Sequence, residues 1–157
     1  MHEPAAPVTA RWAEAIVAEA AEAVIAVDRE GAIRLWNRGA EALFGYTAAE
    51  ALGQGLELIV PERFRAAHWS GFSRAIESGR TTGGDRVRTT RSMHKDGRRL
   101  YVELSFGLVY DGSGGVAGAF AIGRDGTTRH AAAAGDASAA GPRPEGPASG
   151  PASDPAA

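Results

Sequence analysis

The chain of 157 residues contains no cysteine, and this absence removes several kinds of site at once. Without a thiol the protein can build neither a disulfide framework nor a cysteine-ligated zinc or iron–sulfur centre. It also offers no thiolate nucleophile and no sulfur for a covalent adduct with a photoreceptor chromophore. A functional site in this protein must therefore use other side chains.

Lysine is nearly as scarce, since Lys95 is the only one, and the formal net charge is −2. This balance gives no electrostatic reason to expect direct contact with nucleic acid or with an acidic membrane surface. No run of 18 apolar residues is present, and the first residues lack the basic and apolar segments of a signal peptide. We therefore expect a cytoplasmic protein with no membrane contact.

Composition divides the chain into a folded part and two flanks. Residues 131–157 contain no apolar side chain larger than alanine, so they can bury little surface against an ordering entropy of about 1–2 kcal/mol per residue. We predict that residues 1–8 and 130–157 are disordered. Residues 9–21 are predicted to form an N-terminal flanking helix, and residues 22–129 a single domain.

Within this domain the pattern predicts two strands, several short helices and three strands joined by hairpins. The predicted strands cover residues 23–28, 32–37, 85–94, 100–109 and 116–125, and the longest helix covers 61–78. Such an order is typical of an α+β fold, here a five-stranded antiparallel sheet with short helices on one face. Strict alternation in the fourth strand places Leu104 and Phe106 on its inward face.

The helix predicted over residues 61–78 carries a histidine within its apolar stripe. On a helical wheel Phe64, His68 and Phe72 fall within about one quadrant, so the imidazole should point toward the core. A buried polar group without a partner costs about 1–3 kcal/mol. Two partners remain open from the residues alone: a backbone carbonyl, or a metal such as iron.

The strand predicted over residues 85–94 has mixed periodicity, so its inward face stays open. An even-numbered inward face would consist of Arg86, Arg88, Thr90 and Ser92. An odd-numbered one, which hydrophobicity favours, would consist of Val87, Thr89, Arg91 and Met93. Met93, and less readily His94 beside the hairpin turn, are further candidate ligands for a bound metal.

Three stretches in this order resemble the PAS family: AVIAVDREGAIRLWNRGAEALFGYTAAEALGQGLELIVPE, HKDGRRLYVELSF and GRDGTT. The resemblance covers about residues 22–128, and it implies that residues 22–129 form a PAS sensor domain. Such domains bind a small ligand between sheet and helices and pass a change to a partner. No catalytic motif is present, so we do not expect an enzyme.

The helix PERFRAAHWSGFSRAIESG resembles that of the oxygen-sensing FixL-type haem-PAS kinases. This resemblance implies that His68 ligates haem b, that Arg88 contacts bound O2 and that Arg74 pairs with a haem propionate. The expected walls of the pocket are Phe64, Phe72, Leu104 and Phe106. Gly83 and Gly84 depart from that family, which has bulky apolar residues there.

Two alternatives to a haem-based oxygen or redox sensor remain open. One is a cofactor-free PAS module for protein interaction or dimerisation. The other is a domain that binds flavin without a covalent bond, stacked on Trp36, Trp69 or Phe72.

The end of the domain departs from other PAS domains, with Gly126 where a β-branched residue is usual. We expect no output helix after it, so the signal should leave through a separate kinase or a regulator of transcription, or through a homodimer. The N-terminal helix carries Trp12, Ile16 and Val17 on an apolar stripe that suits dimerisation. Packing of this stripe against the chain's own sheet is an equal alternative.

Overall fold

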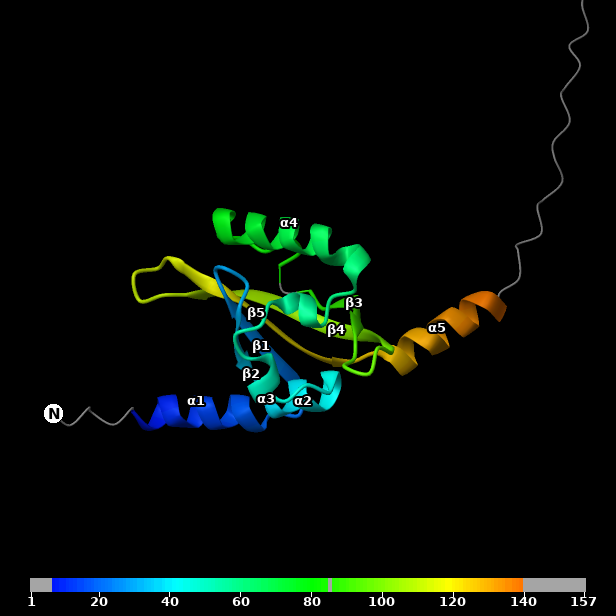
Figure 1. Ribbon diagram of the computed structural model, residues 1–157, viewed down its shortest axis with the longest axis horizontal. Helices are drawn as coiled ribbons and strands as arrows, with labels where there is room; N and C mark the ends of the chain where they lie inside the picture. The colour runs from blue at the N-terminus through cyan, green and yellow to red at the C-terminus, as the bar shows by residue number, and fades with distance from the viewer. Residues whose placement is uncertain (1–6, 85, 140–157) are drawn as a thin grey trace, which may run out of the picture.

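A computed structural model of the chain describes residues 7–84 and 86–139, arranged as Figure 1 shows. The disorder predicted for residues 1–6 and 140–157 lies outside this part of the chain. Pro7 and Val8, which the same prediction included, precede and begin the first helix.

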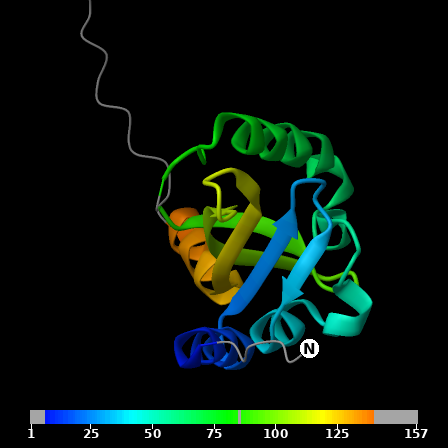
Figure 2. The same ribbon diagram turned by 90° about the vertical axis from the view of Figure 1, so that its left-hand side faces the viewer.

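Five strands form one antiparallel sheet in the order β2-β1-β5-β4-β3. They are β1 (Ala23–Asp28), β2 (Ile33–Trp36), β3 (Arg88–Met93), β4 (Arg99–Tyr110) and β5 (Val116–Asp125). In Figure 2 the strands fill the middle of the molecule and the helices lie around them. The predicted α+β fold is confirmed; β1 has the predicted bounds, whereas β3 begins at Arg88 rather than near residue 85.

The helices are α1 (Val8–Glu19), α2 (Arg38–Phe44), α3 (Ala48–Ala51), α4 (Glu62–Ser78) and α5 (Thr127–Ala139), with a short 3-10 turn over Leu56–Leu58. In Figure 1 α4 runs along one side of the sheet, whereas α1 and α5 extend toward opposite ends of the long axis. Over the part of the chain that the structure describes, no helix is both long and apolar enough to cross a membrane.

The core lies between one face of the sheet and the short helices α2 and α3. Alternate residues of β1 and β4 are buried on that face, and Phe44 of α2 is completely buried against them. Trp36 packs on Phe44 with ring centroids 5.5 Å apart, and its indole N–H donates to the carbonyl of Tyr46 at 2.9 Å. Trp36 is therefore a core residue.

The pairing of β3 with β4 decides which face of β3 points inward. Arg88, Thr90 and Ser92 lie opposite Leu104, Val102 and Leu100, whose side chains are buried. Directly opposed residues share a face of the sheet, so the even-numbered face is inward. The hydrophobicity argument, which favoured the odd-numbered face, gives the wrong result for this strand.

Asn37, at the N-cap of α2, joins three elements through a buried amide. Its Oδ1 accepts from the backbone N–H of Val24 at 2.8 Å and of Ala40 at 2.9 Å. Its Nδ2 donates to the carbonyls of Val17 at 2.8 Å and Glu22 at 3.0 Å. Both ends of the amide are satisfied, and the end of α1 is held to β1 and α2.

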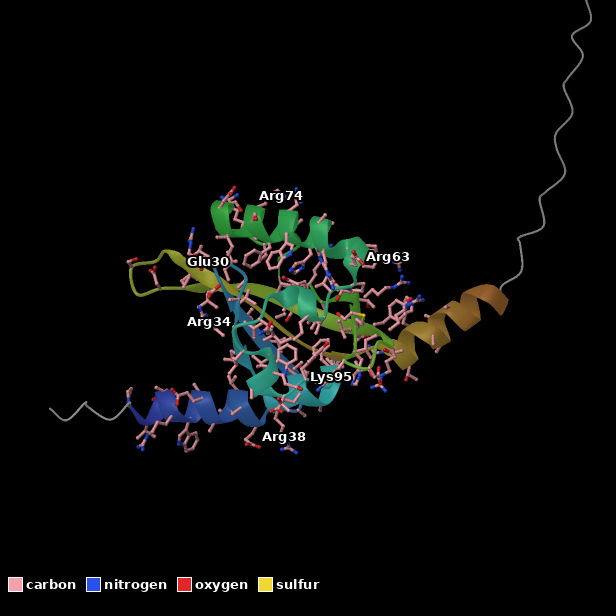
Figure 3. All side chains as sticks on the ribbon, viewed as in Figure 1. Glu30, Arg34, Arg38, Arg63, Arg74 and Lys95 are labelled. Atoms are coloured by element: carbon pink, nitrogen blue, oxygen red, sulfur yellow. The ribbon has the colours of Figure 1, made fainter. Side chains whose placement is uncertain are left out.

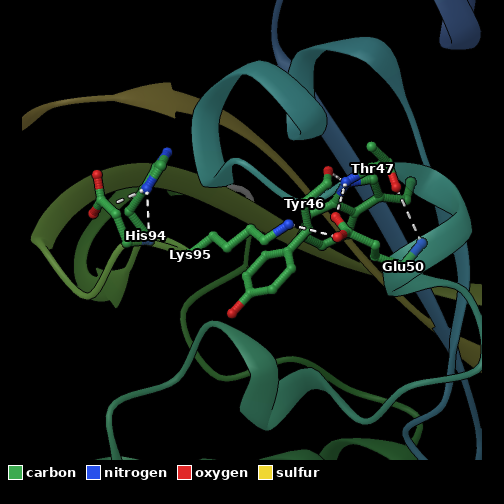
Figure 4. Close-up of polar contacts among 7 residues, drawn as sticks. Tyr46, Thr47, Glu50, His94 and Lys95 are labelled. Carbon is green, nitrogen blue, oxygen red and sulfur yellow. Dashed lines mark hydrogen bonds and ion pairs between the residues drawn. The ribbon is translucent and has the colours of Figure 1, made fainter.

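The β3–β4 hairpin docks on α2 and α3 through two neighbouring residues (Figure 4). Lys95 donates from its backbone N–H to the carbonyl of Phe44 at 2.9 Å, and its ammonium pairs with Glu50. Glu50 also closes the predicted capping box with Thr47. The ring of His94 lies against Gly45, the left-handed residue that ends α2.

We expect Gly45→Ala to destabilise the protein through this docking. Gly45 has φ 82°, and a Cβ there would lie 2.6 Å from the imidazole of His94. The left-handed conformation alone costs a non-glycine residue about 1–2 kcal/mol. Gly53 is the matched control, since it has the same φ of 82° and a Cβ there would meet no atom within 4 Å. Urea denaturation should show a larger loss for Gly45→Ala than for Gly53→Ala, and equal losses would contradict the His94 contact.

The prediction for the C-terminal end of the domain is wrong, and at the N-terminal end the structure decides between the two alternatives. The sequence predicted no output helix and disorder from residue 130, yet α5 covers Thr127–Ala139. Alanine is the strongest helix former, and the start of α5 is fixed because Gly126 N–H donates to the Tyr101 carbonyl at 2.7 Å. At the other end, α1 has no buried residue, so it does not pack back on the sheet.

Candidate functional site

A cavity of about 450 Å³ lies between α4 and the sheet. Its size falls within the range of about 300–1,000 Å³ that is usual for ligand pockets. It is lined by Ile25, Val27, Leu56, Ile59, Val60, Phe64, Ala67, His68, Phe72, Thr90, Arg91, Ser92, Leu104, Phe106, Ala119, Phe120 and Ala121. Most of these side chains are apolar, so the cavity suits a largely hydrophobic ligand.

α4 contributes the three side chains that the helical wheel placed together. Phe64, His68 and Phe72 follow one another at a spacing of four residues and all line the cavity. Leu104 and Phe106 line it from β4, as their alternation predicts. Phe64 and Phe106 are each 38% exposed, which places them at the open side of the cavity.

The imidazole of His68 is the unusual polar group of this cavity. Its Nε2 is buried and has no hydrogen-bond partner; no other buried side-chain nitrogen or oxygen in residues 7–84 and 86–135 lacks one. Burial lowers the pKa of His68 below its usual value, and the carboxylate of Glu57 opposes part of this shift. The ring is therefore neutral near pH 7, and its Nε2 makes no hydrogen bond within the protein.

The two arginines assigned by resemblance do not reach the cavity. Arg74 lies on the side of α4 away from the sheet (Figure 3), lining a separate surface pocket near the end of that helix. Arg88 is on the inward face of β3, but its guanidinium lies against Gly83, where a Cβ would overlap it. The resemblance assigns Arg74 and Arg88 by their positions in the sequence. The position of a residue does not fix the direction in which a long side chain extends.

The alternative ligands and stacking residues also lie elsewhere. Met93 and His94 are not among the cavity-lining residues, and Nδ1 of His94 accepts from the backbone N–H of Asp96 at 3.1 Å. Trp69 packs against Phe72 and Gly31 outside the cavity. Of the three residues predicted to stack on a flavin, only Phe72 lines the space.

Arg91 is the functional candidate that the sequence analysis did not assign. It belongs to the odd-numbered face of β3, which is the edge strand of the sheet, and it is among the residues that line the cavity. Its guanidinium lies 5.9 Å from the ring centroid of Phe64 and 5.3 Å from that of Tyr101. Its Nη2 donates to the Tyr101 hydroxyl at 2.8 Å.

Comparison with known proteins identifies the family. The family model of the PAS fold matches residues 13–126, which is most of the chain. The chain belongs to the PAS family. The sheet order, the helices between β2 and β3, and the cavity beneath α4 are thus those of a PAS domain that senses a signal.

Solved structures extend the comparison, whereas no curated protein matches the chain. A PAS domain from Colwellia psychrerythraea is 26% identical, with a TM-score of 0.67 over 77% of this chain and 99% of that one. An RNA-binding Light-Oxygen-Voltage receptor is 23% identical, with a TM-score of 0.62 over 83% of this chain and 37% of the receptor. A domain of a sensory box sensor histidine kinase/response regulator from Geobacter sulfurreducens is 22% identical, with a TM-score of 0.57 over 74% and 94%. The last two likenesses show the fold alone.

Proposed function

We propose that this PAS domain is a haem-based sensor and not an enzyme, with haem b bound in the cavity through His68. The observation that carries the proposal is the buried Nε2 without a hydrogen-bond partner, on a histidine that lines an apolar space of about 450 Å³. A haem iron held by one histidine supplies an open coordination position for a gas such as O2 and a one-electron redox couple. Neutral imidazole is the form that ligates iron, and burial favours it at His68.

The other candidate residues of the site limit the proposal to a single protein ligand and to no particular gas. The described side chains of residues 7–84 and 86–135 include no group of three or more potential metal ligands. In the proposed complex His68 would be the one protein ligand to iron held by a porphyrin. Arg88 lies against Gly83, which removes the support for its predicted contact with O2. The signal is accordingly a diatomic gas or a change of redox state, with no preference for O2 built in by Arg88.

Titration of the purified protein with haemin tests this proposal. We expect a sharp Soret band, shifted from that of free haemin, which saturates at one haemin for each chain. The same titration of His94→Leu is the control, because His94 does not line the cavity and should leave the band unchanged. A spectrum that stays that of free haemin at every protein concentration would contradict the proposal.

A second candidate function, a module for dimerisation, is favoured by the exposed side of α1. Val8, Trp12 and Ile16 are 60%, 69% and 65% exposed and follow one another at a spacing of four residues. A continuous apolar stripe of this kind pairs well with a second copy of itself, since a two-fold interface is self-complementary. A homodimer through α1 and a kinase or transcription regulator acting as a separate partner are both compatible with haem binding.

We expect polar substitutions in this stripe to weaken a homodimer without unfolding the domain. Burial of a large apolar side chain contributes about 1.5–3 kcal/mol, so Trp12→Glu and Ile16→Glu should each raise the dissociation constant at least about tenfold. Ala18→Glu, on another exposed side of α1, is the control. Sedimentation velocity over a range of concentrations measures the effect. A mass that all three variants leave unchanged would rule out α1 as the interface.

A further inference from the structure

Arg91 is the one permanently charged residue among those that line the cavity. The other lining residues described above are apolar or neutral near pH 7, and none is acidic. None of the ion pairs among residues 7–84 and 86–135 includes Arg91. Its guanidinium therefore meets no carboxylate of this part of the protein, although it borders a low-dielectric space.

The local partners of Arg91 use little of its hydrogen-bonding capacity. One N–H donates to the hydroxyl of Tyr101 at 2.8 Å, and the central carbon of the guanidinium lies over the rings of Phe64 and Tyr101. A guanidinium has five N–H donors in a planar fork that matches the two oxygens of a carboxylate. Charge-assisted bonds of this kind are about twice as strong as neutral ones, so a carboxylate is a better partner than the Tyr101 hydroxyl.

We propose that Arg91 binds a carboxylate of the cavity's ligand, so that the ligand class is an amphipathic molecule with an apolar body and an anionic end. The inference rests in part on the proposed function, because haem b with its two propionates is one such ligand. It assigns the propionate contact to Arg91, in place of Arg74. Phe64 and Phe106 flank the open side of the cavity, where the anionic end would remain near solvent.

Ligand binding at Arg91 would also affect α5, because Tyr101 contacts both Arg91 and α5. The ring of Tyr101 stacks on that of His130 with centroids 3.7 Å apart and planes at 19°. Tyr101 further holds the start of α5 through Thr127, whose hydroxyl accepts from the Tyr101 N–H at 3.0 Å. A carboxylate that draws Arg91 from the Tyr101 hydroxyl would remove one of the contacts that hold the Tyr101 side chain beside α5.

Haemin and its dimethyl ester form the matched pair of probes for this inference, since they differ only in the two carboxylates. We expect Arg91→Gln to weaken haemin binding about 10- to 100-fold and to leave binding of the dimethyl ester unchanged. Arg74→Gln should change neither. Tyr101→Phe should not weaken haemin binding, because it leaves Arg91 free for the ligand. If the Arg91–Tyr101 hydrogen bond served only the structure, Arg91→Gln and Tyr101→Phe would both lose affinity for haemin.

A second pair of probes separates this inference from haem binding. Decanoate should raise the melting temperature of the native protein more than decan-1-ol does, and Arg91→Gln should remove the difference. If haemin fails to bind while the decanoate effect depends on Arg91, the proposed haem is wrong and the carboxylate site stands. If neither haemin nor decanoate loses binding in Arg91→Gln, or if neither binds at all, the carboxylate site is wrong.

Discussion

Substitution of His68 with leucine is expected to abolish axial ligation of haemin and to stabilise the ligand-free protein. Loss of a group that only orients a metal ligand lowers metal affinity 10- to 100-fold, so loss of the ligand itself should lower haemin affinity by at least about 100-fold. The gain in stability has a separate cause. Leucine removes the buried Nε2 that has no partner, and an unsatisfied group of this kind costs about 1–3 kcal/mol. We expect a gain of about 1 kcal/mol in urea denaturation.

These two opposite effects distinguish a ligand from a structural histidine. A core histidine bonded to a backbone carbonyl would destabilise the protein when replaced, because its partner would lose a hydrogen bond. His94→Leu is the matched control, since His94 accepts from a backbone N–H and packs on Gly45. It should lose stability and retain haemin binding. A loss of stability in His68→Leu that equals the loss in His94→Leu would show that His68 is structural.

Asn37→Ala is expected to be the most destabilising polar substitution in this domain. It would leave the N–H groups of Val24 and Ala40 and the carbonyls of Val17 and Glu22 without their buried partner. Loss of an N-cap alone costs about 0.5–2 kcal/mol, and each further buried orphan adds to this, so we expect a total of about 3 kcal/mol. Urea denaturation of the ligand-free protein measures it.

Two further variants separate the energy of helix capping at Asn37 from the energy of its other hydrogen bonds. Thr47→Ala measures the loss of a helix cap alone, and Asn37→Asp tests the donor side of the amide. Thr47 caps α3 at an exposed site, so its loss should cost only the capping energy of about 1 kcal/mol. Asn37→Asp keeps the acceptor but places a carboxylate against three carbonyl oxygens, and its stability should improve as the pH falls and the carboxyl is protonated. A cost for Asn37→Ala no greater than that for Thr47→Ala would mean that the bonds to α1 contribute nothing.

Local signals predicted most of the fold because they act over short distances. The alternation of Leu100–Val109, the Thr47–Glu50 capping box and the glycine that ends α4 all reflect backbone and packing preferences of neighbouring residues. The inward face of β3 could not be predicted this way, because it depends on register with β4. The prediction of disorder from residue 130 rests on the low content of large apolar residues, whereas the high helix propensity of alanine favours α5.

The site could be predicted where side chains are short or held on a helix. Spacing along α4 placed Phe64, His68 and Phe72 on the cavity, as the structure does. Long arginine side chains behaved differently: Arg88 is on the expected face but turns to Gly83, whereas Arg91 starts on the other face and reaches the cavity. The sequence contains no signal for either path, because each depends on the edge position of β3 and on what lies beside it.

Binding of zinc protoporphyrin IX, followed by NMR of the imidazole rings, tests the presentation of His68 most directly. This diamagnetic porphyrin accepts one axial imidazole and shifts its protons strongly upfield by its ring current. The chain has four histidines, at positions 2, 68, 94 and 130. We predict that the ring protons of His68 alone show this large shift, on formation of a complex with one porphyrin for each chain. A large shift at another histidine, or unchanged His68 signals in the presence of excess porphyrin, would contradict the account.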